Sequence, residues 1–378
     1  MPLFETILLA ADFSENSREA FRSACSLATE GKTRIKVLHV EEPRYVAEEP
    51  IYHGQPAVRF SAVERTPEEL KTLDEELKKS YTPDRKLAID YLTREGSPAE
   101  QILLAAQEFE CSLIVVGTHG RTGLSRLLAG SVAEEVIRGA KCPVLALRTP
   151  EHEGHASQRI RCILTPIDQS ESSLHAARLA RSLAKQLGAR LVLLEVAPPE
   201  VFTGTDILIP VDLRACRQAL EDSRRELDGP DLSAPVEAVL RQGYVDSEIL
   251  DLAKSLPCDL IVMGTHGRSG LSRLLMGSVT EAVLRRSSFP VLAVKPASSL
   301  LKEEAVRERI QDPKPAEERH EPSPLAPRAG IQTTSVRVSA EQLREAEANR
   351  HAHAAGPSIR DRMVEIGRGN QQAGRQGS

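Results

Sequence analysis

The sequence contains no tryptophan, and only 12 of its 378 residues are aromatic: seven phenylalanines and five tyrosines. Single-stranded nucleic acid is bound largely by stacking on aromatic side chains, and many sugar sites also depend on stacking, so this composition disfavours both classes of ligand. Apolar residues still make up 40% of the chain, which is enough for ordinary cores. We therefore expect cores built from leucine, valine, isoleucine and alanine.

Long apolar runs and ordered cysteine patterns are also absent. No stretch approaches the ~20 apolar residues of a transmembrane helix, and residues 1–6 lack the basic segment of a secretory signal. The six cysteines are scattered without a Cys-x-x-Cys pair, so neither a disulfide framework nor a zinc site is predicted. The net charge of −5 gives the chain no overall attraction to nucleic acid or anionic membranes. We expect a cytoplasmic protein with reduced cysteines and neither of these partners.

What the sequence does contain is a long internal repeat. Residues 111–132 and 258–279 are identical at 18 of 22 positions, at an offset of 147. Residues 7–12 match residues 163–168 at an offset of 156. The difference of nine residues falls in a loop that is longer in the first copy, where it covers residues 41–62. A period near 150 residues is too long for a solenoid unit and indicates a duplicated domain.

Each copy alternates short apolar segments with amphipathic ones. In the first copy the apolar segments are rich in Ile, Val and Leu, which is typical of strands buried on both faces of a parallel sheet. They cover residues 5–11, 34–41, 86–92, 112–117 and 143–148. A helical pattern follows the first strand of each copy and ends before Gly31 or Gly188. This order predicts two tandem five-stranded, doubly wound α/β sandwiches of Rossmann-like type, with ligands at the carboxyl ends of the strands.

The repeat and the composition divide the chain into four parts. We expect a first domain at 1–150, a linker at 151–158, a second domain at 159–296 and a tail at 297–378. The tail has no aromatic residue and six prolines, so it is expected to be disordered. A capping-box sequence in the tail predicts one short polar helix at 339–354, which is either solvated or docks a partner.

The pattern Gly-x2-Gly-x9-Gly-Ser follows the fourth strand of each copy and leads into a helix. Glycines at such a turn let a ligand approach the backbone N–H groups, and the N-terminus of the following helix favours an anion. The pattern therefore predicts a phosphate site in each copy. Its residues are Gly117, Gly120, Gly130 and Ser131 in the first copy, and Gly264, Gly267, Gly277 and Ser278 in the second.

A purely structural interpretation of the same pattern is also open. Ser131 with Glu134, and Ser278 with Glu281, have the spacing of capping boxes, which contribute about 1 kcal/mol without any ligand. Loop arginines favour the phosphate interpretation because they neutralise its charge. They are Arg121 and Arg126 in the first copy, and Arg268 and Arg273 in the second.

With an aspartate closing the first strand, the GTHGR(T/S)GLSRLL(A/M)GSV segment resembles the universal stress protein family in a tandem, two-domain form. The resemblance covers residues 3–148 and 159–295 and implies an adenine nucleotide alpha hydrolase-like fold. It also implies the ATP-binding subgroup of that family, because both copies carry the complete glycine motif. The implied ligand is ATP, or ADP or AMP, together with Mg²⁺, at one site in each domain.

The resemblance assigns site residues by position. The nucleoside would lie beside the aspartate that ends the first strand, and the adenine edge beside the backbone of a valine that ends the second. The aspartates could instead cap the next helix with Ser14 or Ser170, and the valines could be sheet core. Beyond the motif glycines, serines and arginines, the assigned residues are Asp12, Val40, Val116 and Val132, then Asp168, Val196, Met263 and Val279.

In neither copy is the glycine motif followed by the Gly-Lys-Ser/Thr of a P-loop, and no paired carboxylate, Ser/His/Asp order or metal-spaced cluster recurs in both halves. His119 and His266 recur, but inside the glycine loop, where backbone or phosphate contacts are expected. We expect a nucleotide-dependent stress-response regulator or chaperone-like partner rather than an enzyme, with its domains paired as a pseudo-dimer through Val144–Leu147 and Val291–Val294. A slow ATPase or nucleotide-transfer enzyme, and a structural interaction protein with empty pockets, are the alternatives.

Overall fold

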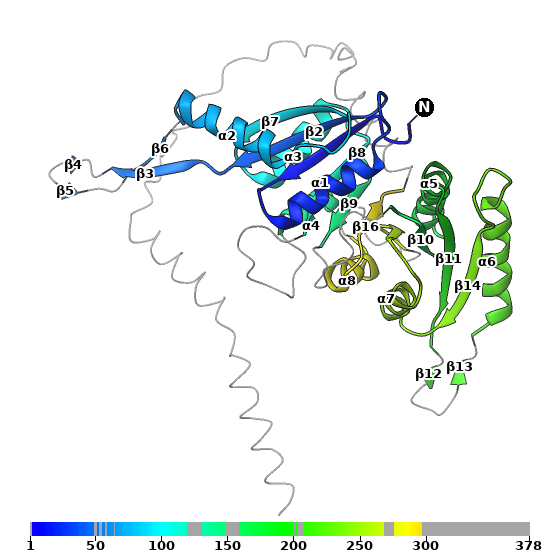
Figure 1. Cartoon of the computed structure of the whole chain (residues 1–378). Coiled ribbons are helices and arrows are strands. Elements are labelled where there is room, and N and C mark those ends of the chain that lie inside the picture. Colours follow the sequence, from blue (N-terminus) through cyan, green and yellow to red (C-terminus); the bar gives the residue numbers. More distant parts are fainter. Residues whose placement is uncertain are drawn as a thin grey trace, which may run out of the picture. The chain divides into compact units, whose positions relative to one another are not determined.

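The computed structural model describes an α/β structure in each half of the chain (Figure 1). The described residues are 2–48, 51–52, 55–56, 59–63, 65–118, 131–148, 159–199, 201–202, 208–209, 211–267 and 276–296. The expected linker at 151–158, the tail from 297 and its helix at 339–354 lie outside them. No helix within the described ranges is long and apolar enough to cross a membrane.

The first half follows the expected alternation of strands and helices. Its elements are β1 (Thr6–Ala11), α1 (Glu15–Leu27), β2 (Arg34–Glu41), β3 (Arg44–Glu48), β4 (Ile51–Tyr52), β5 (Gln55–Pro56), β6 (Arg59–Val63), α2 (Pro67–Ser80), β7 (Ala88–Glu95), α3 (Pro98–Glu108), β8 (Leu113–Gly117), α4 (Ser131–Gly139) and β9 (Val144–Leu147).

The second half repeats this order. Its elements are β10 (Cys162–Ile167), α5 (Glu171–Leu187), β11 (Arg190–Ala197), β12 (Val201–Phe202), β13 (Leu208–Ile209), α6 (Leu213–Leu227), β14 (Glu237–Gln242), α7 (Val245–Ser255), β15 (Leu260–Gly264), α8 (Ser278–Arg286) and β16 (Val291–Val294).

Ten of these strands form one sheet in the order β14-β11-β10-β15-β16-β9-β8-β1-β2-β7. Within each half all pairs are parallel. In each half the second and third strands of the sheet lie on one side of the first strand, and the last two lie on its other side. The topological switch point is therefore between β1 and β8 in the first half, and between β10 and β15 in the second. The tandem, doubly wound α/β fold expected from the sequence is thus confirmed, and these two switch points are where such sheets bind ligands.

The two halves meet where β9 pairs with β16 in antiparallel fashion, with Leu145 opposite Leu292. These are the strands that the sequence predicted as the contact. Because the strands inside each half are parallel, this one antiparallel pair makes the strands of the second half run opposite to those of the first. The carboxyl ends of the two halves therefore lie at opposite edges of the sheet.

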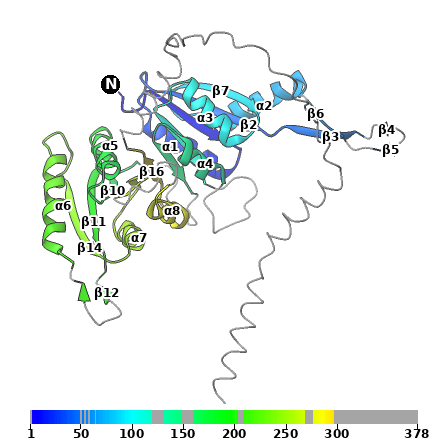
Figure 2. The same cartoon turned by 180° about the vertical axis from the view of Figure 1, so that it is seen from behind.

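Helices cover both faces of the sheet (Figure 2). Buried side chains of α1, α2, α5 and α6 pack on one face, and those of α3, α4, α7 and α8 pack on the other. The core is aliphatic, as expected, with one aromatic cluster added under α1, where Phe13, Phe21 and Tyr81 pack together. The buried Tyr81 hydroxyl lies 2.6 Å from Ser17 Oγ and accepts a hydrogen bond from the Phe13 amide, which ties α1 to the end of β1.

The helices that follow β1 and β10 begin in the same way. The hydroxyls of Ser14 and Ser170 each accept a hydrogen bond from the amide three residues later, which caps α1 and α5. Gly188 ends α5 in the left-handed conformation, with φ = 66°, which glycine adopts without a steric penalty. Gly31 has φ = 70° but lies beyond the end of α1, which closes at Ala28.

The regions after β2 and β11, which the sequence analysis treated as loops, contain short antiparallel pairs. β3 pairs with β6, β4 with β5, and β12 with β13. A signal for the longest pair was present in the β-branched and aromatic residues of Arg-Tyr-Val-Ala-Glu and Arg-Phe-Ser-Ala-Val, which are enriched in strands. The nine extra residues of the first copy therefore lengthen a hairpin rather than an irregular loop.

We predict that Gly264→Ala destabilises the protein, because β15 ends against the start of α5. A Cβ on Gly264 would lie 2.5 Å from Ser172 Oγ and 2.8 Å from the Ser172 carbonyl carbon, so the backbone must shift. The free energy of unfolding should fall by about 2 kcal/mol, a typical cost of overpacking. Gly117→Ala is the matched control in the first half: its nearest contact would be Asn16 Cβ at 3.1 Å. Urea denaturation that ranks Gly117→Ala as the more damaging change would contradict this account.

Candidate functional site

An aspartate follows the first strand of each half and forms the same turn. Asp12 Oδ1 accepts hydrogen bonds from the Ser14 amide at 3.0 Å and its hydroxyl at 2.5 Å. Asp168 Oδ1 accepts the same two bonds from Ser170, at 3.0 and 2.5 Å. The local capping contact considered for these aspartates is therefore present in both halves, through one carboxylate oxygen. It holds the carboxylate at the carboxyl edge of the sheet.

The glycine loop of the second half begins beside this aspartate. A Cβ on Gly267 would lie 3.0 Å from Asp168 Oδ2, so the second carboxylate oxygen faces Gly267. Gly264 and Gly117 serve a different purpose, since each lies against the start of α5 or α1. Among the described motif glycines, Gly267 thus faces the aspartate, Gly264 and Gly117 permit close packing of a strand end on a helix, and Gly277 precedes the next helix.

The helix that follows the loop begins with its donors exposed. Gly277 is the N-cap of α8, its amide donates to the Thr265 carbonyl at 2.8 Å, and no side chain caps the helix. Ser278 is an exposed first-turn residue, and its amide and those of the next two residues have no carbonyl one turn earlier in the helix to bind. This is the geometry of an anion-binding helix N-terminus.

The capping box expected at Ser278 and Glu281 is therefore wrong. The Glu281 carboxylate pairs with Arg285, one turn further along α8, rather than reaching back. In the first half Glu134 likewise pairs with Arg138, at 2.5 Å. In both helices the glutamate pairs with an arginine four residues later instead of bonding to the helix start. The serine hydroxyl at the helix start is therefore available to a ligand.

Apolar residues assigned to the site share one face of the sheet in each half. The side chains of Val116 and Met263 are buried there, whereas the valines assigned beside them are only partly buried against the same apolar cluster. The partly buried ones are Val40 and Val132 in the first half, and Val196 and Val279 in the second. In each half the structure thus brings the assigned residues to one face of the sheet at the switch point. They come from β2, β8 and α4 in the first half, and from β11, β15 and α8 in the second.

Several assigned residues cannot be placed. The first-copy residues Gly120, Arg121, Arg126 and Gly130, and the second-copy residues Arg268 and Arg273, lie outside the described residues, as does His119. His266 is described: its Nδ1 lies 2.9 Å from Thr265 Oγ1, and its amide donates to Ser172 Oγ at 3.4 Å. These contacts fit the expected structural role of this histidine inside the loop.

The buried residue of the second strand that lies beside the end of the first strand differs between the halves. The repeat comparison made from the sequence did not include this position. In the first half it is His39, 3% exposed, with Nδ1 2.6 Å from the Ala11 carbonyl and Nε2 2.6 Å from Glu41 Oε1. Glu41 is also paired with the buried Arg65. Each ring nitrogen of His39 therefore has a hydrogen-bond partner, one on the backbone and one on a side chain.

The second half places a carboxylate at this position. His39 and Glu195 are equivalent at the repeat offset of 156, and Glu195 is 2% exposed with Gln169 Nε2 3.4 Å from Oε2. The offset was the signal that could have revealed the exchange. The two candidate sites therefore share the geometry of the aspartate turn but differ in the ionisable side chain buried beside it.

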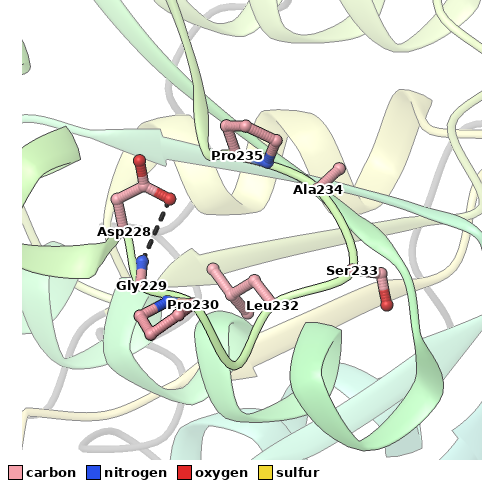
Figure 3. Close-up of a pocket in the computed structure, with 7 residues that line it drawn as sticks. All are labelled: Asp228, Gly229, Pro230, Leu232, Ser233, Ala234 and Pro235. Atoms are coloured by element: carbon pink, nitrogen blue, oxygen red, sulfur yellow. Dashed lines mark hydrogen bonds between the residues drawn. The ribbon is translucent and has the colours of Figure 1, made fainter.

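Two other features of the described residues, clusters of potential metal ligands and a surface cavity, do not form a functional site. Among the described residues no group of three or more His, Cys, Asp or Glu is placed to hold a metal. A cavity of about 560 Å³ is formed by residues 228–235 of the loop between α6 and β14 (Figure 3). It lies at the amino end of β14, away from the carboxyl edge, and Asp228 Oδ1 there already accepts from the Gly229 and Val236 amides.

These observations define a class: a duplicated, doubly wound α/β protein with an aspartate at each switch point, a glycine motif after the fourth strand of each half, and an uncapped helix start in the second half. Residues 3–148 and 159–295 both match the Universal stress protein family. The chain belongs to this family.

Individual relatives agree with that assignment. A universal stress protein of Mycobacterium tuberculosis is 31% identical over 224 residues, which is 58% of this chain and 72% of the relative. One of Mycolicibacterium smegmatis is 26% identical over 77% of this chain and 97% of its own length. The crystal structure of a universal stress protein from Archaeoglobus fulgidus superposes with a TM-score of 0.51 at 20% identity, over 78% of this chain and 99% of that chain, and supports the fold alone.

We predict that two thiols with strongly raised pKa values, those of Cys142 and Cys258, are unreactive in the native protein. Burial raises the pKa of Cys142 and Cys258 to about 12, so very little thiolate exists at pH 8. Labelling with a maleimide should leave both unmodified until urea unfolds the chain, as read by peptide mass spectrometry. Rapid labelling of either thiol in the folded protein would contradict the structure. In the unfolded chain thiols ionise near pH 8.5, so the free energy of unfolding should also decline as the pH rises above that value.

Proposed function

We propose that the protein is a stress-response regulator that binds one adenine nucleotide in each half. The observation that carries this proposal is the coincidence, at each switch point, of a strand-end aspartate and an exposed serine that begins a helix. In the second half the start of the glycine loop lies beside the aspartate, since a Cβ on Gly267 would be 3.0 Å from Asp168 Oδ2. In the first half the same motif is present in the sequence, although part of it lies outside the described residues.

Each part of the site has a chemical role in this proposal. The amides at the start of α4 and α8, with the hydroxyls of Ser131 and Ser278, bind phosphate oxygens. Asp12 and Asp168 contact the nucleoside, and the backbone of Val40 and Val196 meets the adenine edge. Mg²⁺ would be carried on the phosphates, because the described residues offer it no carboxylate cluster.

The same chemistry favours a binding protein over an enzyme. Backbone amides and a serine hydroxyl hold phosphates in the ground state and the transition state alike, and such uniform binding does not accelerate turnover. In neither half does the Gly-Lys-Ser/Thr of a P-loop follow the glycine motif, so the lysine that such enzymes place on the phosphates is missing. We therefore propose that the nucleotide sets the conformation or the partner affinity of the protein, in the cytoplasm. A slow ATPase is the second candidate, and its favouring observation is the carboxylate that faces the glycine loop.

Calorimetric titration of the full chain with ATP and Mg²⁺ should give a stoichiometry near two. Gly277→Val should reduce it to about one, because a Cβ there would lie 3.1 Å from the Thr265 carbonyl oxygen and would displace the start of α8. Gly31→Ala is the control for a strained glycine substitution away from the motif, since φ at Gly31 is 70° although a Cβ there would contact nothing within 4 Å; stoichiometry should stay at two. A wild-type value of zero would overturn the proposed function, and a value of one would show that one site is degenerate.

Bound ATP should persist for many minutes. The test is to load the full chain with ATP and Mg²⁺, remove the excess, and follow the nucleotide by chromatography. Steady conversion to ADP at ~1 s⁻¹ or faster, the low end for ordinary enzymes, would replace the regulator by the ATPase alternative. Asp12→Asn and Asp168→Asn would then identify the half in which hydrolysis occurs.

A further inference from the structure

Two basic side chains cross from one half to the other beside the β9–β16 junction. Lys295 directly follows β16, and its Nζ donates to the Arg138 carbonyl of α4 at 2.7 Å. Arg148 directly follows β9, and its Nη1 donates to the Arg285 carbonyl of α8 at 3.4 Å. Donors and acceptors are both separated by the repeat offset of 147. The two contacts are therefore equivalent under the pseudo-twofold symmetry of the repeat.

Both acceptors lie in the last turn of a helix. α4 ends at Gly139 and α8 at Arg286, so these carbonyls lack a partner within their own helix. A cation at this end also complements the helix dipole. Each contact thus holds a helix by its C-terminal end, and the side chain that holds it comes from the other half.

The opposite ends of the same two helices form the candidate phosphate sites. α4 begins at Ser131 and α8 at Ser278. Nine residues span about 13 Å, and each helix returns antiparallel to its strands, so it runs from its own carboxyl edge toward the opposite edge. That opposite edge is the carboxyl edge of the other half, because β9 and β16 are antiparallel.

Each of these two basic residues directly follows a strand residue whose carbonyl accepts a hydrogen bond from the start of the glycine loop in the same half. The Thr265 amide, at the start of the second loop, donates to the Val294 carbonyl at 2.9 Å, one residue before Lys295. The Thr118 amide donates to the Leu147 carbonyl at 2.8 Å, one residue before Arg148. A short, continuous chain of contacts therefore links the loop of one site to the helix of the other, once in each direction.

We infer that Lys295 and Arg148 are positioning residues that couple the two nucleotide sites, each joining the loop of its own half to the phosphate-binding helix of the other half. The inference rests on the proposed function. It requires a crossed effect: loss of Lys295, a residue of the second half, changes affinity in the first half, and loss of Arg148 changes affinity in the second. A merely local or stabilising role would act on the half in which the residue lies, or on both alike.

The test measures each site separately in the full chain. Gly277→Val leaves the first-half site and Gly130→Val leaves the second-half site, and ATP binding to each background is measured by calorimetry. Lys295→Ala should raise the dissociation constant about threefold in the first background, as expected for one cation at a helix end, and leave the second unchanged. Arg148→Ala should do the reverse. Lys295→Arg should restore affinity, because it keeps the donor and the charge.

Arg178→Ala is the control for loss of a basic side chain, since Arg178 pairs only across an exposed contact with Glu226 in its own half; it should change neither site. If Lys295→Ala does not fold, as judged by circular dichroism, Lys295→Gln provides the same measurement with a neutral donor. An effect confined to the residue's own half, an equal effect on both halves, or no effect in either background overturns the coupling. Absence of ATP binding in both backgrounds and in the wild type instead removes the proposed function, and the coupling with it.

Discussion

The antiparallel pairing of β9 with β16 is the interaction on which the rest of the structure depends. It makes one ten-stranded sheet from two five-stranded ones and covers the last strand of each half, which would otherwise present unpaired backbone groups. It also fixes the direction of the second half against the first. The two switch points consequently lie at opposite edges, and the helix that begins at one site ends near the other. A parallel pairing of the same strands would have put both sites on one edge and separated the helix ends from the opposite loops.

The two copies share the backbone geometry of the candidate site but differ in the side chains buried next to it. The Asp–Ser turn and the strand-end glycine belong to this backbone in both halves, and the hydrogen-bond lengths of the aspartate turns repeat closely. Beneath the strand end, His39 with Glu41 and Arg65 is replaced by Glu195 with Gln169. The two halves therefore place different ionisable side chains beneath a similar backbone.

The site is made mainly of backbone groups, and this bears on function. Amides at a helix start recognise the charge and shape of a phosphate without a reactive side chain, and the serine hydroxyl adds one more donor. Such a site suits a ligand that is held and sensed. The contacts that leave the site also run through backbone groups, from a loop amide to a strand carbonyl and from a basic side chain to a helix carbonyl, so occupancy is transmitted by the position of whole elements.

The sequence by itself determined the tandem repeat, the α/β class and nearly every sheet strand, because each of these is encoded locally: the apolar runs at 34–41 and 112–117 became β2 and β8 almost residue for residue. It also determined which residue types stand at the switch points. It could not decide between a capping box and an ion pair for Glu281, because Arg285 and Ser278 are both within reach along one helix and only packing selects the partner. Nor could it reveal the contacts of His39 with the Ala11 carbonyl, of Gln169 with Glu195, or of Lys295 with the Arg138 carbonyl. These contacts join residues far apart in the chain, and only the tertiary structure brings them within hydrogen-bond distance.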